Sequence, residues 1–207
     1  MKVRRWMTEA VQTIHPDDLL ETATEKMKQG HFRRMPVVDQ NGTLVGILSE
    51  RDAREHHGYL PVTRVNAAMT EQPITIAPDA PIDTAAALLL EHKIGGLPVV
   101  SDGNLIGIIT ETDLLSGFLQ GLGGGQQTST RIDFEFTSEK QTFADAVLAV
   151  EKAGGTILGL GTKRTTPEHE EGRGFYLRVC GRDVEGIAEA LRDAHYAVKA
   201  VHTPGTP

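Results

Sequence analysis

Cysteine, aromatic residues and positive charge are all scarce in this chain of 207 residues. The single cysteine, Cys180, excludes an internal disulfide framework and every zinc ribbon that needs several cysteines. The 21 lysine and arginine residues against 28 acidic residues give a net charge of -7. Because that charge opposes a phosphate backbone, we expect no nucleic-acid partner.

Long apolar segments are also missing. The longest apolar stretch, near residues 85–90, is far too short to span a bilayer. The first 13 residues have no apolar core of the kind that a signal peptide needs. We therefore expect a soluble, cytoplasmic protein with no membrane partner.

Motifs that carry known catalytic chemistry are absent. There is no Gly-x-Ser-x-Gly elbow, no phosphate-binding Gly-x-x-x-x-Gly-Lys loop and no His-Glu-x-x-His pair. His56 and His57 are adjacent and cannot comfortably face one metal, and residues 168–171 are more typical of a solvated acidic loop than of a cation site. The sequence predicts no catalytic residue, no metal site and no cofactor.

A duplication organises the first part of the chain. Several markers recur in the same order at an offset of 62 residues, among them Met7-Thr8 with Met69-Thr70 and Met35-Pro36-Val37-Val38 with Leu97-Pro98-Val99-Val100. The offset then falls to 61, because the turn at residues 39–42 is answered by the shorter turn at 101–103. A complete second copy with one deletion indicates gene duplication, and two copies favour a pseudo-twofold pair over an array.

Each copy predicts the element order β-α-β-β-α. Residues 82–92 are rich in alanine and leucine and predict a helix, with Asp79 as its cap; Asp17 or Asp18 would cap the helix of the first copy. Asn41-Gly42 and Asp102-Gly103 lie between apolar runs and predict hairpin turns. Neither copy could cover its apolar sheet alone, so we expect the two to pack together.

The second strand of each copy ends in a hydroxyl residue followed three positions later by aspartate: Ser49-x-x-Asp52 and Thr110-x-x-Asp113. One interpretation is purely structural, because this spacing is close to a helix capping box. The other is functional. A carboxylate in such a position can accept hydrogen bonds from a ribose diol, and the neighbouring hydroxyl and helix amides suit a phosphate. The two roles are compatible.

The pattern changes after residues 121–130, which read as a flexible linker rich in glycine, glutamine, serine and threonine. Periodicity then predicts strands at 131–137, 155–162, 174–179 and 196–202 and helices at 142–153 and 183–194. That order, βαββαβ, is the ferredoxin-like arrangement of an α+β domain.

The duplicated unit resembles a tandem pair of cystathionine-β-synthase-type (CBS) domains, the module known as a Bateman pair. The resemblance lies in the Met-Thr pairs, the two Pro-Val-Val strands and the Gly-x-x-[Ser/Thr]-x-x-Asp end of each copy. The whole chain is similar to the acetoin-utilisation protein B type, whose tail is an ACT-type regulatory domain. The resemblance implies CBS motifs at residues 1–64 and 65–120, the linker at 121–130 and an ACT-like domain at 131–203.

The resemblance further implies an adenosine-containing regulatory ligand, such as AMP, ADP, ATP or another derivative, in two clefts. The aspartates would hold ribose and the hydroxyl residues would face phosphate. Carried onto this sequence, the first cleft comprises Thr13, Ile14, Arg34, Met35, Pro36, Ser49, Arg51 and Asp52. The second comprises Thr75, Ile76, Gly96, Leu97, Pro98, Thr110, Thr112 and Asp113.

The two clefts differ in charge. The first copy has Arg33, Arg34 and Arg51 where the second has Gly95, Gly96 and Thr112. Because guanidinium groups pair with phosphate in a two-pronged geometry, we predict that the first cleft prefers the ligand with more phosphate. A solvated surface pair is the alternative interpretation of Arg33-Arg34.

The ACT-like segment lacks one family feature. ACT domains that bind a ligand commonly have a glycine turn between the first strand and helix, whereas residues 138–141 contain none. A dimerisation or signalling role therefore competes with amino-acid binding. We expect a non-enzymatic sensor that forms a homodimer and acts on a regulated enzyme. A structural assembly module without a ligand is the alternative, and an enzyme is the least favoured class.

Overall fold

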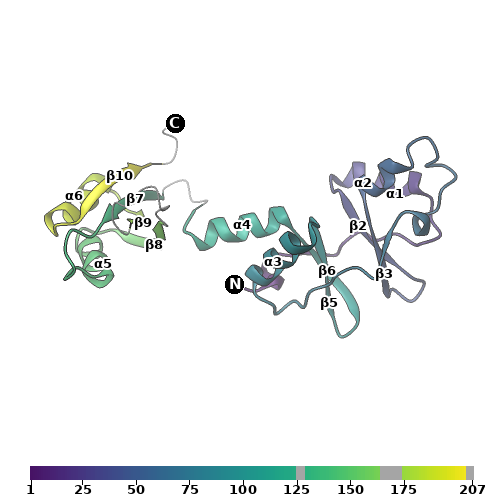
Figure 1. Cartoon of the computed structure of the whole chain (residues 1–207), viewed down its shortest axis with the longest axis horizontal. Helices are drawn as coiled ribbons and strands as arrows, with labels where there is room; N and C mark the ends of the chain where they lie inside the picture. The colour runs from purple at the N-terminus through teal and green to yellow at the C-terminus, as the bar shows by residue number, and fades with distance from the viewer. Residues whose placement is uncertain (125–128, 164–173, 204–207) are drawn as a thin grey trace. The chain divides into compact units, whose positions relative to one another are not determined.

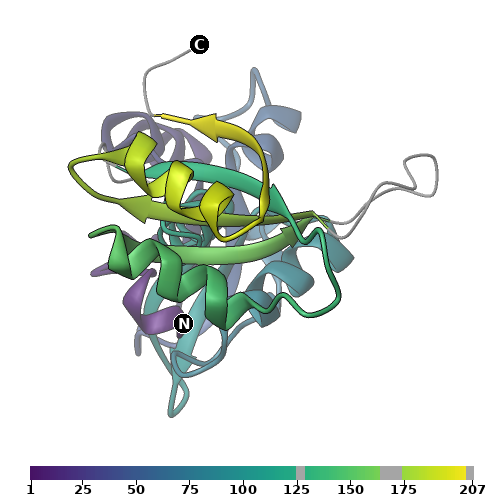
Figure 2. The same ribbon diagram turned by 90° about the vertical axis from the view of Figure 1, so that its left-hand side faces the viewer.

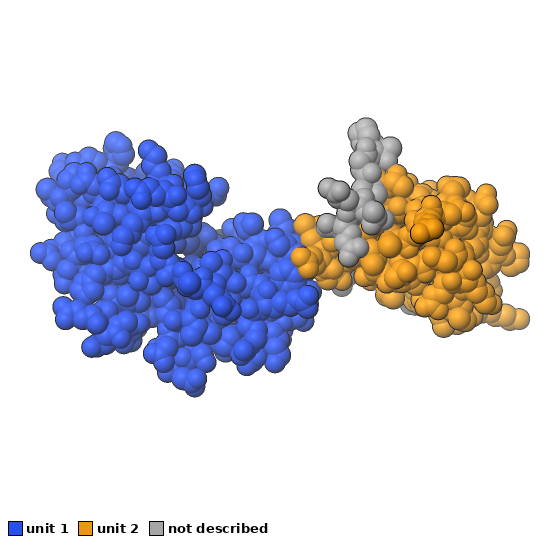
Figure 3. All heavy atoms as spheres, turned by 180° about the vertical axis from the view of Figure 1, so that it is seen from behind, with its two compact units in different colours: residues 1–117 blue, residues 118–207 orange. Residues whose placement is uncertain are grey.

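The computed structural model describes residues 1–124, 129–163 and 174–203 of the chain. It divides into two compact units, Met1–Gly117 and Phe118–Pro207 (Figure 3). The duplicated copies do not separate from one another, so both lie in the first unit. None of the helices within the described ranges is long and apolar enough to cross a membrane.

The first unit contains the same set of elements twice (Figure 1). The first set is η1 (Val3–Arg5), β1 (Thr8–Glu9), α1 (Leu20–Gly30), β2 (Arg34–Val38), β3 (Leu44–Ser49) and α2 (Glu50–Glu55). The second is η2 (Val65–Ala67), β4 (Thr70–Glu71), α3 (Ile82–His92), β5 (Gly96–Ser101), β6 (Asn104–Thr110) and α4 (Glu111–Gly121). The helix predicted at residues 82–92 is confirmed with the same bounds.

Both predicted hairpins are present. Strands β2 and β3 pair antiparallel, as do β5 and β6. Gly42 and Gly103 adopt φ angles of 80° and 81°, the left-handed region that glycine enters without steric cost. In the first turn, Oδ1 of Asp39 accepts the backbone amides of Asn41 and Thr43. The glycines that predicted these turns therefore adopt the backbone conformation that the turns require.

The two copies exchange strands. Strand β1, from the first copy, pairs antiparallel with β6 of the second, and β4 pairs antiparallel with β3 of the first. The resulting sheets have the orders β1-β6-β5 and β2-β3-β4. Each three-stranded sheet therefore takes one edge strand from the other copy.

The core beside the β2-β3-β4 sheet also contains residues of both copies. Leu20, Met35 and Leu48 are fully buried, and Val65 of the second copy is buried among them. The amide of Val65 donates to the carbonyl of Asp18 at 2.8 Å. Burying a side chain of this size contributes about 1.5–3 kcal/mol, so Val65 helps to hold the copies together.

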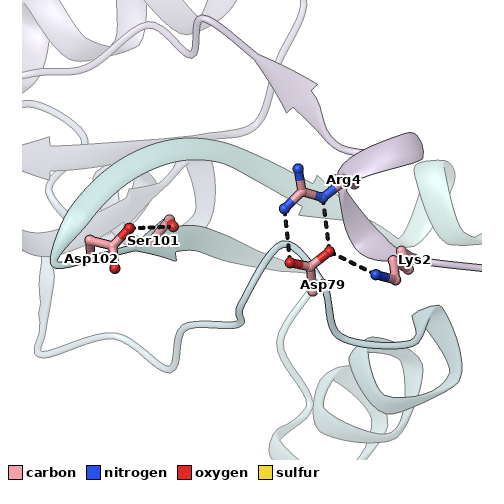
Figure 4. A network of polar contacts seen from close by, with 5 residues as sticks. All are labelled: Lys2, Arg4, Asp79, Ser101 and Asp102. Atoms are coloured by element: carbon pink, nitrogen blue, oxygen red, sulfur yellow. Dashed lines mark hydrogen bonds and ion pairs between the residues drawn. The ribbon is translucent and has the colours of Figure 1, made fainter.

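The predicted aspartate caps are wrong. Leu19 and Pro81 are the N-cap residues of α1 and α3, and neither makes a side-chain cap hydrogen bond. Figure 4 shows that Asp79 instead faces Lys2 and Arg4, with both oxygens engaged at 2.9–3.0 Å. The carboxylate is held by two cations from the start of the chain, which the local sequence around α3 could not reveal.

The second unit contains β7 (Thr130–Glu135), α5 (Phe143–Lys152), β8 (Thr156–Lys163), β9 (Gly174–Cys180), α6 (Val184–Asp193) and β10 (Ala197–His202). The predicted order βαββαβ is the order found. Neighbouring strands are antiparallel in the sheet order β10-β7-β9-β8. Figure 2 shows both helices on one face of that sheet. Residues 125–128 of the expected linker and the acidic loop at 168–171 lie outside the described residues.

Aromatic residues fill the space between this sheet and its helices. Phe134 is 1% exposed and meets Tyr196 edge-on, with ring centroids 5.5 Å apart. The hydroxyl of Tyr196 donates to the carbonyl of Thr142 at 2.8 Å, at the start of α5. Burial raises the pKa of Tyr196 above its ordinary value, with the charge of Asp145 adding to the effect. The second unit thus has its own hydrophobic core.

Candidate functional site

Both tetrads form helix caps. The hydroxyl of Ser49 accepts the amide of Asp52 at 3.2 Å, and Oδ2 of Asp52 accepts the amide and hydroxyl of Ser49 at 2.8 and 2.7 Å. At the start of α4, Oδ2 of Asp113 accepts the amide and hydroxyl of Thr110 at the same two distances. Ser49 and Asp52 therefore form a capping box, as the structural interpretation predicts, and Asp113 makes the same two contacts with Thr110. Each aspartate makes these contacts through one of its two oxygens.

Each tetrad also lines a cavity in the first unit. The cavity that contains Ser49 and Asp52, here named the Asp52 cavity, has a volume of about 770 Å³. The cavity that contains Thr110 and Asp113, named the Asp113 cavity, has a volume of about 570 Å³. Both volumes fall within the range of small-molecule pockets, roughly 300–1,000 Å³. Capping and lining a pocket are thus combined in the same residues.

The lining of the Asp52 cavity contains both apolar and charged side chains. Its apolar lining comprises Ile47, Pro73, Ile74 and Ile94. Its charged lining comprises Arg33, Arg34, Arg51, Arg54, Lys93, Glu50, Asp52 and Glu55. Apolar side chains together with a carboxylate and several cations suit a ligand that has a base, a sugar diol and a phosphate.

The Asp113 cavity has less positive charge. Its charged lining consists of Arg33 and Arg34 with Glu111 and Asp113, and Val11, Phe32 and Ile108 supply apolar surface. Thr112 stands where the first copy has Arg51. The difference in charge that the sequence predicted is therefore present in the lining of the two cavities.

The structure brings together different segments from those predicted. Thr13 and Ile14 were expected beside Asp52, but the Asp52 cavity is lined by Pro73 and Ile74 of the second copy. The Asp113 cavity is lined in the corresponding place by Val11 and Gln12 of the first copy, not by Thr75 and Ile76. The reason is the strand exchange, because β4 leads into residues 72–74 beside β3, and β1 leads into residues 10–12 beside β6.

Several predicted cleft residues lie in the core instead. Ile14 and Ile76 are 2% and 6% exposed. Ile14 forms a parallel bridge with Val37 in β2, and Ile76 forms the equivalent bridge with Val99 in β5. The strand residues Met35, Pro36, Leu97 and Pro98 are buried as well. Their apolar character reflects packing in the sheets rather than contact with either cavity.

Of the remaining predicted residues, Ser49, Arg51 and Asp52 line one cavity, and Thr110, Thr112 and Asp113 line the other. Gly96 differs, because it lines the Asp52 cavity. Gln72–Ile74 and Lys93–Ile94 also line that cavity, although no sequence motif pointed to them. The repeat markers Thr8 and Thr70 were the available signal for the segments 10–12 and 72–74, because each marker precedes one of these segments.

Arg34 lines both cavities. Its Nη1 donates to the carbonyl oxygen of Gly95 at 2.6 Å. Burial lowers the pKa of Arg34 from its ordinary value and the charge of Arg33 adds to this, whereas Glu111 and Asp52 oppose it. An arginine remains cationic despite such a shift, so a half-buried positive charge stands between the two tetrads.

Comparison with known proteins places similarity in the first unit. A family model described as CBS domain matches residues 3–59 and 62–119. A CBS domain-containing protein of Dictyostelium discoideum is 34% identical over 127 residues, covering 55% of this chain and 88% of its own length. A homoserine O-acetyltransferase of Methanococcoides burtonii is 38% identical over 109 residues, which make up 52% of this chain but 22% of that enzyme.

Solved structures agree. CBSX2 in complex with AMP has a TM-score of 0.53 at 32% identity, covering 57% of this chain and 96% of that one. The CBS pair of MJ0100 with 5′-methylthioadenosine and S-adenosyl-L-methionine has a TM-score of 0.54 at 27% identity, covering 57% and 95%. AcuB of Vibrio cholerae, described as an acetoin utilization protein, has a TM-score of 0.52 at 33% identity, covering 57% and 90%.

Proposed function

The chain belongs to the CBS-domain family, and from that premise we propose that its first unit is a regulatory module that binds adenosine-containing ligands in the Asp52 and Asp113 cavities. The observation that carries the proposal is the repeated tetrad, whose aspartate lines a cavity of suitable size in each of the two cases. Relatives of known structure hold AMP, or 5′-methylthioadenosine with S-adenosyl-L-methionine, and this supports the ligand class.

In this proposal each aspartate has two tasks. One oxygen of Asp52 holds Ser49 at the start of α2, and the other accepts hydrogen bonds from the ribose diol. The base packs against the apolar lining formed by Ile47 and Ile74, and phosphate pairs with Arg34 and Arg51. Asp113 serves the ribose of a second ligand in the same way.

The second unit is proposed to be an ACT-type domain that passes on the state of the cavities. Its element order and its antiparallel sheet with both helices on one face support this assignment. The turn between β7 and α5 is closed by its own side chain, because Oε1 of Gln141 accepts the amides of Thr137 and Ser138 at 2.6 and 3.1 Å. This favours signalling or dimerisation over amino-acid binding.

Helix α4 supports a link between the units. It begins at Glu111 in the Asp113 cavity, and the chain continues from its last turn into the second unit. We propose that a ligand in the Asp113 cavity affects the second unit through α4 and the residues that follow it. Such coupling requires a ligand that binds one of two states more tightly.

We also propose that the protein is a cytoplasmic homodimer that regulates a partner enzyme and has no catalytic role of its own. Leu90 of α3 and Leu115 of α4 are 79% and 63% exposed, which supports a further apolar contact. Similarity to AcuB supports a place in acetoin utilisation. The alternative is an assembly module without a ligand, which the capping role of both tetrads would equally permit.

Calorimetric titration of the full chain with AMP, ATP, NAD and S-adenosylmethionine tests the proposal. Saturable binding of at least one compound, weakened by Asp52→Ala or Asp113→Ala, is the expected result. The matched control is Asp83→Ala, since Asp83 is an exposed aspartate in the first turn of α3. Failure of all four compounds to bind would favour the assembly module, and turnover of any of them would show an enzyme.

A further inference from the structure

One guanidinium serves two cavities. Arg34 lies in the lining of both the Asp52 and the Asp113 cavity. Its hydrogen bond to the Gly95 carbonyl crosses from the first copy to the second. The same carbonyl accepts the amide of Glu111 at 3.4 Å, so Arg34 and the first residue of α4 share one acceptor.

The second copy is shaped to receive this side chain. A Cβ added at Gly95 would lie 2.1 Å from Nη2 of Arg34, and one at Gly96 would lie 2.9 Å from its Cδ. Both distances are too short for real contacts, so Arg34 occupies the space that side chains would fill at these positions. The guanidinium is thereby kept at the boundary between the cavities.

The Asp113 cavity depends on shared charge. Its lining contains two arginines, Arg33 and Arg34, both of which also line the Asp52 cavity, and one histidine, His31, which does not. Arg33 is exposed to solvent, which screens its charge, whereas Arg34 is half-buried. The Asp52 cavity has three further cations of its own, Arg51, Arg54 and Lys93. A phosphate in the Asp113 cavity therefore competes for a group that the other cavity also uses.

We propose that Arg34 couples the two cavities by charge, so that a phosphate bound in one lowers the affinity of the other for a second phosphate. The inference rests on the proposed function, because it assumes adenosine ligands. A ligand without phosphate forms no ion pair with the Arg34 guanidinium and therefore produces no coupling. The favoured state then holds one phosphorylated ligand, in the Asp52 cavity, and one uncharged adenosine derivative, in the Asp113 cavity.

Methyl NMR of the full chain can follow each cavity separately. Ile74 lines the Asp52 cavity and Ile108 lines the Asp113 cavity, so their methyl signals report the two occupancies. In a titration with AMP, we expect filling of one cavity to weaken the other about tenfold, within the usual range of coupling between sites. In a titration with adenosine, we expect a change of less than about twofold.

Two arginine variants separate coupling from simple loss of charge. Arg34→Met should remove the coupling for AMP, whereas Arg51→Met should weaken the Asp52 cavity alone and leave the coupling in place. Equal coupling for AMP and adenosine, or coupling that survives Arg34→Met, would overturn the inference while leaving the proposed function intact. If Arg34→Met does not fold, the comparison of AMP with adenosine on the unmodified chain decides. Absence of binding by both AMP and adenosine would overturn the inference, whereas the proposed function is rejected only if ATP, NAD and S-adenosylmethionine fail to bind as well.

Discussion

Nη1 of Arg34 lies 2.6 Å from the carbonyl oxygen of Gly95, a residue 61 positions further along the chain. Arg34 begins β2 of the first copy, and Gly95 immediately precedes β5 of the second. A hydrogen bond between a half-buried cation and a backbone carbonyl contributes about 1.5–3 kcal/mol. This contact therefore fixes a charge of one copy against the backbone of the other, at the place where the two cavities meet.

Gly95→Ala should displace Arg34. Because the new Cβ would lie 2.1 Å from Nη2, the guanidinium must shift, and we expect its hydrogen bond to the Gly95 carbonyl to weaken. We expect AMP affinity to change in both cavities, by about threefold or more, a change of roughly 0.7 kcal/mol. Calorimetry on Gly95→Ala, Arg34→Ala and the double variant checks this. If the alanine acts only through Arg34, it should have almost no further effect in the Arg34→Ala background.

Asp52→Ala should have two separable effects. Loss of the carboxylate that accepts the amide and hydroxyl of Ser49 should lower the free energy of unfolding by about 1 kcal/mol. Loss of the ribose contact should weaken binding in the Asp52 cavity about tenfold or more, since hydrogen bonds to a charged group contribute roughly 1.5–3 kcal/mol. Chemical denaturation measures the first effect, and the Ile74 methyl signal in a titration measures the second.

The Ile108 signal, in the Asp113 cavity, serves as the internal control for that variant. Asp113→Ala should give the reciprocal pattern. A variant that loses stability but keeps its affinity would mean that these aspartates are caps and nothing more.

The contact of Asp79 with Lys2 and Arg4 should respond to pH. Hydrogen bonds from these cations, first from Lys2 and then from Arg4, lower the pKa of Asp79 below its ordinary value of 3.8. A depressed folded-state pKa stabilises the fold above 3.8, and this contribution is lost as pH falls through the lower folded value. Asp79→Asn should therefore lower Tm at neutral pH and have a shrinking effect as the solution is made more acidic than pH 3.8.

Asp102→Asn is the matched comparison, because Asp102 accepts a hydrogen bond from the hydroxyl of Ser101 at 3.1 Å rather than from a cation (Figure 4). Thermal unfolding of both variants over a range of pH gives the answer. A constant difference between Asp79→Asn and the unmodified chain, at every pH, would contradict the argument.

Phe134→Ala should destabilise the second unit and leave the first unaffected. Phe134 is 1% exposed, and truncation of a buried phenylalanine costs about 3–5 kcal/mol. The one tryptophan, Trp6, lies in the first unit, so its fluorescence follows that unit alone. Calorimetry should show that the second unit unfolds at a lower temperature, in a transition that Trp6 fluorescence does not report.

The matched change on the surface is Leu160→Ala, at a side chain that is 52% exposed in β8. It should alter stability by less than about 0.5 kcal/mol. A shift of the Trp6 transition in Phe134→Ala would show that the two units unfold together.

Local sequence patterns predicted the elements well. Residues 82–92 combine strong helix formers with regular apolar spacing, and α3 has those bounds. The hairpin turns followed from Asn41-Gly42 and Asp102-Gly103, where glycine takes a positive φ. In each case the information lies within a few residues, so neighbouring side chains and backbone conformation determine the result.

The pairing between copies could not be predicted in this way. An offset of 62 residues shows that β1 and β4 are equivalent. The same offset is compatible with pairing inside each copy and with the pairing between copies that the structure shows. The tetrads were found because they repeat in sequence. The segments around Val11 and Ile74 were missed because their place beside a tetrad depends on that long-range choice.

The reciprocal pairing of β1 and β4 has a consequence for how such a chain could arise. Two polypeptides that trade identical elements make a domain-swapped dimer. Here the same trade occurs inside one molecule, as if two ancestral subunits had been joined end to end. A single repeat expressed by itself would have one short strand without a pairing partner and a sheet that lacks one edge strand. It should form both pairings by dimerising with a second copy of the same repeat.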